Sequence, residues 1–114
     1  MKRRSLTLSA AALALVPLLG HAQQAFPDKP ITFVVPFAAG TATDQIARAL
    51  GNSITAETKQ PVVIDNRAGA SGFIASQQVA KAAADGYTVL ITTNTTHAAN
   101  EHLFKKLPYD PVKD

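Results

Sequence analysis

The sequence predicts an α/β domain built on a parallel β-sheet. Three short stretches rich in β-branched and aromatic residues recur along the chain. Each is followed by a loop of small residues and then by a stretch with helical character. Strand, loop and helix repeated in this order favour a parallel sheet with right-handed crossover connections. The 114 residues include no cysteine, which excludes disulfides and thiolate metal sites.

The first 22 residues predict a secretory signal peptide. Positive charges at residues 2–4 precede an apolar run over residues 6–19, and Gly20-His21-Ala22 supplies the small residues that a signal peptidase reads. The run of about 14 residues is shorter than the roughly 20 that a membrane-spanning helix needs. We therefore expect cleavage after Ala22 and export, by the Sec route or, given Arg3-Arg4, the twin-arginine route.

The positive net charge belongs to the precursor. Three of the 11 basic residues lie in the predicted signal peptide, and the eight that remain match the eight acidic residues. The 92 residues that remain after cleavage are near neutral and hold no basic run interleaved with aromatic residues, so a nucleic-acid partner is not expected.

The first strand–loop–helix unit spans residues 30–58. Residues 30–37 are almost wholly apolar, which indicates a strand buried on both faces. After the loop at residues 38–43, a helix is predicted from Asp44 to about Thr58, because Ile46, Leu50 and Ile54 recur at the spacing of an apolar helix face. Capping oxygens are available at the start of this helix from Thr41, Thr43 and Asp44.

Two further units follow. Residues 61–65 predict a strand, residues 66–72 a glycine-containing loop, and residues 73–84 an alanine-rich helix that ends at Asp85-Gly86. Residues 87–91 predict the third strand, residues 92–96 its polar loop, and residues 97 to about 104 a short helix.

The three loops share one chemical character, which suits a small anion. Parallel sheets bind ligands beyond the carboxyl ends of their strands, where helix N-termini and bare backbone N–H groups attract negative charge. Neutral hydroxyls and amides are available there from Thr41, Thr43, Ser71, Thr92, Thr93, Asn94, Thr95 and Thr96. A small carboxylate held by dipoles is one interpretation; ordinary helix caps and turns are the other.

Catalytic and cofactor motifs do not match. The loops carry neither a dinucleotide-binding glycine pattern nor a Walker lysine, and no cofactor is expected. His97, Glu101 and His102 do not have a zinc-protease spacing, so capping or ion pairing is favoured over a metal. No serine lies in a nucleophile elbow, and no catalytic residue is assigned. For Asp44 a helix cap and a ligand contact both remain open, and for Arg67 an ion pair with Asp65 is favoured over an anion.

An ordered series of short segments carries a family resemblance. The segments are Phe26-Pro27-Asp28-Lys29-Pro30-Ile31, Val34-Val35-Pro36-Phe37, Ala39-Gly40, Thr43-Asp44, Ala47-Arg48, Gln60-Pro61-Val62-Val63, Asn66-Arg67-Ala68-Gly69-Ala70, Ala84-Asp85-Gly86-Tyr87-Thr88 and Leu103 to Asp114. In this order they closely resemble the start of the tripartite tricarboxylate transporter receptors, the Bug family of periplasmic solute-binding proteins.

The resemblance implies a non-enzymatic, monomeric receptor with a two-lobed Venus-flytrap fold. Such a receptor works in the periplasm and delivers a small organic carboxylate to the membrane components of a tripartite tricarboxylate transporter. The family's ligand-binding positions correspond to Phe37, Ala39, Gly40, Thr43, Asp44, Ala70, Thr93, Thr96, His97 and Asn100. Residues 23–114 would be the first part of lobe I, with lobe II absent, so we expect a truncated N-terminal portion. A non-binding remnant and an exported α/β enzyme acting on a small organic acid are the alternatives.

Two departures from the family pattern concern loop conformation. Thr41 stands where the family commonly has a second glycine, and a positive φ there would strain it. Ala68 replaces a proline and Ser71 a glycine, and both replacements are expected to be accommodated more easily.

Overall fold

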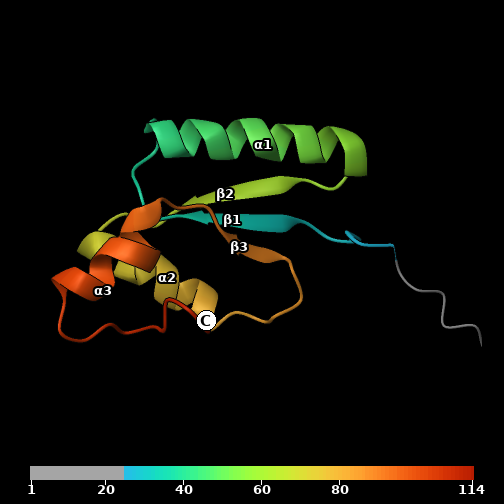
Figure 1. Cartoon of the computed structure of the whole chain (residues 1–114). Helices are drawn as coiled ribbons and strands as arrows, with labels where there is room; N and C mark the ends of the chain where they lie inside the picture. Colours follow the sequence, from blue (N-terminus) through green and yellow to red (C-terminus); the bar gives the residue numbers. More distant parts are fainter. Residues whose placement is uncertain (1–24) are drawn as a thin grey trace, which may run out of the picture.

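The computed structural model describes residues 25–114, so the predicted signal peptide lies outside the described residues. A three-stranded parallel sheet forms the centre, in the order β2-β1-β3. Helix α1 covers one face, and α2 lies with α3 on the other (Figure 1). The described part is therefore α/β and holds three strand–loop–helix units, as the sequence predicts.

Strand β1 (Ile31–Val35) is central because both of its faces are apolar. Ile31, Phe33 and Val35 form a core cluster with Ala47 of α1. Val34 projects to the other face and has no exposed surface, and neither does Ala75 of α2. The prediction of a strand buried on both faces is confirmed, although the strand stops before Pro36 and not at residue 37.

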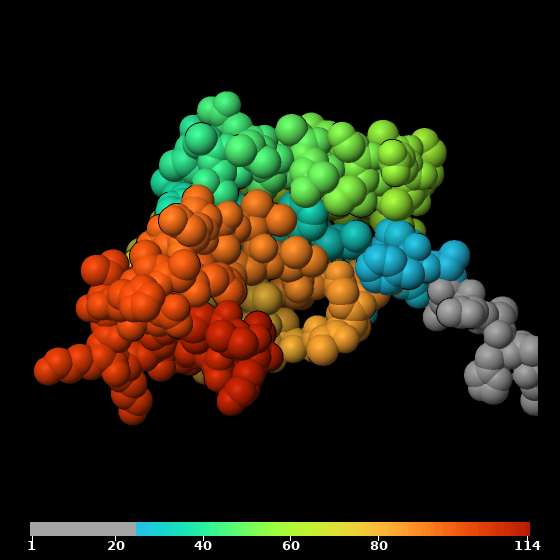
Figure 2. All heavy atoms as spheres, in the orientation of Figure 1, coloured from blue at the N-terminus to red at the C-terminus, as the bar shows by residue number. Residues whose placement is uncertain are grey.

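Helix α1 (Ala42–Thr58) begins two residues earlier than predicted, because Thr41 is its N-cap. The prediction that Ile46, Leu50 and Ile54 form the packed face of this helix is wrong in part. Ala47 and Gly51 are buried against the sheet, whereas Ile46 and Leu50 are 64% and 45% exposed. The small residues let the helix approach β2 closely, since a Cβ added at Gly51 would lie 3.0 Å from Val62 Cγ1. Figure 2 shows α1 as a ridge along one face of the molecule.

The second and third units are shorter or shifted relative to the prediction. Strand β2 (Val62–Asn66) gains Asn66. Helix α2 (Phe73–Ala80) ends four residues early. The Lys81 N–H still donates to the Gln77 carbonyl at 3.2 Å, but the Ala82 N–H donates to the Val79 carbonyl at 3.0 Å, three residues back, which tightens the last turn. Strand β3 (Thr88–Leu90) is followed by a π-helical turn, η2 (Thr95–Ala99), that runs into α3 (Asn100–Leu103).

The segment before β1 packs on the turn before β3, through contacts of residues 26–29 with Asp85 and Tyr87 that we call the clasp. Lys29 Nζ lies 3.0 Å from a carboxylate oxygen of Asp85 and 4.3 Å from the centre of the Tyr87 ring. The Tyr87 hydroxyl also accepts a hydrogen bond of 2.9 Å from the Asp28 N–H, and its ring packs on Phe26 with centroids 4.9 Å apart. This clasp lies at the amino end of the sheet, away from the loops that follow the strands.

Candidate ligand site at the carboxyl edge of the sheet

A cavity of about 320 Å³ opens where the first two strands end. Its volume is within the range of small-molecule sites. The loop after β1 and the loop after β2 form most of its wall, and the turn after β3 adds one residue. The lining residues are Pro36, Phe37, Ala38, Thr41, Ala68, Gly69, Ser71, Gly72 and Thr95. A ligand at this edge of the sheet was one of the two interpretations of the loop sequences.

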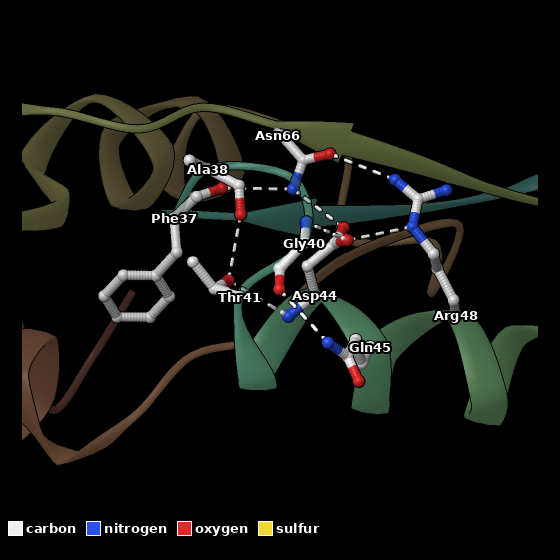
Figure 3. Close-up of polar contacts among 8 residues, drawn as sticks. All are labelled: Phe37, Ala38, Gly40, Thr41, Asp44, Gln45, Arg48 and Asn66. Carbon is white, nitrogen blue, oxygen red and sulfur yellow. Dashed lines mark hydrogen bonds and ion pairs between the residues drawn. The ribbon is translucent and has the colours of Figure 1, made fainter.

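A polar network holds the loop between β1 and α1 (Figure 3). Thr41 Oγ1 donates to the carbonyl of Ala38 at 2.9 Å and accepts from the N–H of Asp44 at 3.4 Å. In return, the Asp44 carboxylate accepts from the N–H of Gly40 at 2.8 Å. These reciprocal bonds resemble a capping box and fix the start of α1. Gly40, at φ +86°, provides the left-handed turn, and Thr41 is extended with φ −69°. The strain considered for Thr41 is therefore not present.

Asn66 connects this loop to the neighbouring strand. Its amide nitrogen donates to the carbonyl of Phe37 and to the Asp44 carboxylate, both at 3.0 Å. Its amide oxygen accepts from Arg48 at 3.3 Å. The Phe37 ring lies away from these bonds, on the side of the loop opposite Arg48 (Figure 3). The Asn66 side chain therefore fixes the backbone of Phe37, and Phe37 lines the cavity.

Asp44 is buried and remains ionised because its charge is compensated. Arg48 Nε donates to it at 2.9 Å, and this bond is the largest of the contributions that hold the pKa of the carboxyl far below its ordinary value. The bonds from Gly40 and Asn66 act in the same direction. Within residues 25–114 both carboxylate oxygens of Asp44 are engaged with protein donors. The ligand contact suggested for Asp44 stays a prediction.

The N-terminus of α1 offers unused donors next to the cavity. The N–H groups of Ala42 and Thr43 have no protein acceptor within residues 25–114, as expected for the first turn of a helix. Thr41, the N-cap of this helix, lines the cavity. Partial positive charge therefore lies at this wall without a cationic side chain.

The loop after β2 has an unusual backbone. Four consecutive residues have positive φ: Gly69 at +117°, Ala70 at +48°, Ser71 at +53° and Gly72 at +84°. Left-handed backbone costs energy in any residue with a Cβ, and such strain concentrates at functional sites. The expectation that serine is easily accommodated at position 71 is therefore corrected, because Ser71, together with Ala70, has the left-handed backbone that Thr41 lacks.

Gly72 is fixed by its contact with the third loop as well as by its φ. A Cβ at this position would lie 2.5 Å from Thr96 Cγ2. Asn100 also joins the two segments, since its amide nitrogen donates to the carbonyl of Ser71 at 2.8 Å and to the Tyr109 hydroxyl at 3.1 Å. Tyr109 in turn donates to the carbonyl of Thr96. The loops after β2 and β3 are thus packed together behind the cavity.

The residues expected to bind ligand have different surroundings. Phe37 lines the cavity and Thr43 is half-buried at the start of α1. Asp44, Thr96 and Asn100 are buried. The exposed members of the set are Ala39, Gly40, Ala70, Thr93 and His97. Their role in binding remains a prediction.

Several cavity residues were absent from the expected set. Of the lining residues only Phe37 belongs to that set; Thr41, Ser71 and Thr95 were noted only as loop hydroxyls, and the remaining five, Pro36, Ala38, Ala68, Gly69 and Gly72, carry no polar side chain. Pro36 lay within the predicted strand over residues 30–37, whereas the other four lie in loops that directly follow a predicted strand, and this position was the available signal.

Two charged side chains near the loops have structural partners. Arg67 Nε lies 2.8 Å from Asp65, so the favoured ion pair is confirmed. Glu101 lies 3.5 Å from His102, and His97 Nδ1 lies 2.7 Å from Thr96 Oγ1.

In the part of the chain that the structure describes, no group of three His, Cys, Asp or Glu residues is placed to hold a metal ion. No helix in the same part is long and apolar enough to cross a membrane.

Known proteins share this sequence and fold. Residues 46–114 match the family model of the tripartite tricarboxylate transporter family receptor. Protein BugT of Bordetella pertussis is 41% identical over 90 residues, which cover 78% of this chain and 28% of BugT. The chain spans about a third of the length of the curated relatives that it matches.

Two solved structures superimpose on the described part. R. palustris Rpa4515 with adipate gives a TM-score of 0.75 at 44% identity, covering 78% of this chain and 30% of that one. MatC (Rpa3494) from Rhodopseudomonas palustris with bound malate gives a TM-score of 0.71 at 43% identity, covering 75% and 29%. Because the sequence match and the fold agree, this chain belongs to the Bug-type tripartite tricarboxylate transporter receptor family.

Proposed function

We propose that this protein is a periplasmic receptor that binds a small carboxylate and delivers it to a tripartite tricarboxylate-type transporter. The observation that carries the proposal is the cavity at the carboxyl edge of the sheet. The cavity lies between the N-terminus of α1, a helix of 17 residues whose first N–H groups are free, and the loop after β2, whose backbone is left-handed. The two solved relatives, with adipate and malate, support the carboxylate class.

The carboxylate lies at the start of α1 in this proposal. Ala42 and Thr43 donate their N–H groups to it. The backbone of the turn at residues 69–72 lies on the other side of the carboxylate, and its Gly72 N–H is already bonded to the Gly69 carbonyl at 3.0 Å. Ala39, Gly40 and Ala70 are small and exposed, which permits close backbone approach. The turn after β3 forms the remaining wall of the site, and it is positioned by Thr93, Thr96, His97 and Asn100.

The family model, which is that of a transporter family receptor, supports binding rather than catalysis. Residues 23–114 are proposed to form the first part of lobe I. Export through a signal peptide cleaved after Ala22 would place this part in the periplasm.

The test is ligand-dependent thermal stability of the purified protein. Adipate and malate are added over a wide concentration range, with adipamide as a neutral control of nearly equal size. A ligand present at 100 times its dissociation constant stabilises the fold by about 2.7 kcal/mol. For a domain of this size, the shift is roughly 10 to 20 °C. We expect a shift with at least one acid and none with adipamide.

Two outcomes would count against the receptor assignment. If no acid raised the melting temperature, the protein would be a non-binding remnant. If adipamide raised it as much as adipate, the site would not select for a carboxylate. Turnover of the acid would indicate the enzyme alternative.

A further inference from the structure

The loop after β2 carries a polar side chain at a position where its backbone favours glycine. Ser71 has φ +53° and ψ +31°, in the left-handed region, and it stands between Ala70 and Gly72, which also have positive φ. Glycine would adopt this conformation without the steric cost that a Cβ brings. Ala70 shares the conformation but offers only a methyl group. Because strained residues of this kind concentrate at functional sites, the hydroxyl of Ser71 is a candidate for a ligand contact.

The Ser71 hydroxyl has no structural partner. It makes no hydrogen bond within residues 25–114, although Ser71 lines the cavity. The other two hydroxyls of the wall are engaged at least in part. Thr41 Oγ1 donates to the carbonyl of Ala38 at 2.9 Å, and Thr95 Oγ1 accepts from Thr93 Oγ1 at 3.2 Å. The Ser71 hydroxyl therefore keeps both its proton and its lone pairs for a ligand.

The backbone that carries this hydroxyl is fixed from the third loop. Asn100 has no exposed surface, and its amide nitrogen donates to the carbonyl of Ser71 at 2.8 Å. The next residue, Gly72, is buried so tightly that a Cβ there would lie 2.5 Å from Thr96 Cγ2. A donor on a backbone that is already ordered costs less to immobilise when a ligand binds.

We propose that Ser71 is a ligand-binding residue whose hydroxyl donates a hydrogen bond to a carboxylate oxygen of the bound acid. The inference rests on the proposed function and adds a side chain to its site. Ser71 lines the same cavity as Thr41, the N-cap of α1, so one carboxylate can accept from the first N–H groups of this helix and from the hydroxyl. No charged side chain lines the cavity within residues 25–114, and a neutral donor is therefore the kind of partner that this wall supplies.

Titration calorimetry of the purified protein with adipate and with malate tests the contact. Ser71→Ala removes the hydroxyl and should weaken the binding of the acids by about tenfold or more, because the lost hydrogen bond is to a charged group. The melting temperature of the ligand-free variant should stay unchanged, since the hydroxyl bonds to no protein group. Ser71→Gly also removes the strained Cβ, so it should weaken binding in the same way without lowering the melting temperature.

Ser53→Ala is the matched control, because it makes the same change at an exposed position of α1 that does not line the cavity. It should leave the affinity unchanged. If Ser71→Ala bound both acids as tightly as the unsubstituted protein, the contact would be overturned while the receptor function stood. A parallel loss of affinity and of melting temperature in Ser71→Ala would also overturn it, because the hydroxyl would then serve the loop. Failure of the unsubstituted protein to bind either acid would overturn both proposals.

Discussion

Alanine substitutions at Gly72 and Gly40 can separate the cost of a steric clash from the cost of a left-handed backbone. Their φ angles are nearly the same, +84° and +86°. A Cβ at Gly72 would lie 2.5 Å from Thr96 Cγ2 and 3.4 Å from Pro36 Cβ, whereas a Cβ at Gly40 meets no atom within 4 Å. Substitution of each by alanine therefore imposes the same backbone strain, but only Gly72→Ala imposes a clash.

The magnitudes follow from these two contributions. An L-residue in the left-handed region costs about 1–2 kcal/mol, offset in part by about 0.4–1 kcal/mol from the lower entropy of the unfolded chain. Overpacking at Gly72 adds about 1–3 kcal/mol, because Thr96 is buried and β-branched. We expect Gly72→Ala to be less stable than Gly40→Ala by about 2 kcal/mol, or roughly 8–16 °C in melting temperature.

Urea denaturation followed by circular dichroism measures these differences, and a double-mutant cycle identifies their cause. Thr96→Ser removes the clashing methyl group and keeps the hydroxyl, so it should recover most of the steric contribution in the Gly72→Ala background. Equal destabilisation by Gly72→Ala and Gly40→Ala, or no coupling between positions 72 and 96, would refute the proposed packing of the second loop on the third.

Three other predictions concern the loop network, the helix–sheet contact and pH. Asn66→Ala removes three hydrogen bonds, two of them to charged groups, and should lower the free energy of unfolding by about 1–3 kcal/mol in urea titrations; an unchanged midpoint would mean that the network does not hold the loop. Gly51→Ala gains about 1 kcal/mol of helix propensity but places its Cβ 3.0 Å from Val62 Cγ1, so we expect a net loss of stability that is smaller in a Val62→Ala background; a stabilised single variant would contradict the close contact. The pKa values of Asp44 and Asp65 are depressed, by hydrogen bonds from Arg48 and Gln78 first of all, so the stabilisation that they give is complete above their unfolded pKa near 3.8 and is lost as the pH falls through their folded values. The urea midpoint should therefore drop steadily between about pH 5 and pH 2, and a midpoint that stays level would argue against these contacts.

The order of the elements was predictable because it depends on local pattern. Apart from the half-buried Thr32, every residue of β1 is apolar and buried, which fits a strand covered on both faces. The orientation of α1 was not predictable in this way. Large residues at Ile46 and Leu50 suggested the packed face, but the helix packs through Ala47 and Gly51, because small residues allow its axis to approach the sheet.

The position of the cavity could be predicted, but not the backbone of the loops that line it. Loops after parallel strands meet at one edge of the sheet, and this rule located the cavity. Which residue in a loop takes a positive φ depends on how the chain connects its neighbours, and the sequence drew attention to Thr41 where the structure strains Ser71. The link from Asn66 to Phe37 joins residues 29 positions apart, so no local pattern could indicate it.

The clasp of Lys29 and Tyr87 has a consequence for the order in which the chain can fold. Strand β1 comes first in the sequence, yet its two partners are residues 62–66 and 88–90, and Asp28 and Tyr87 are 59 positions apart. A chain that is synthesised from its N-terminus therefore exposes the apolar stretch Ile31–Val35 before any strand that can pair with it. Strand β1 acquires its second partner, and the clasp closes, only when residue 90 is free. Until then the most buried strand of the finished domain is its most vulnerable segment, and slow emergence would favour aggregation over folding.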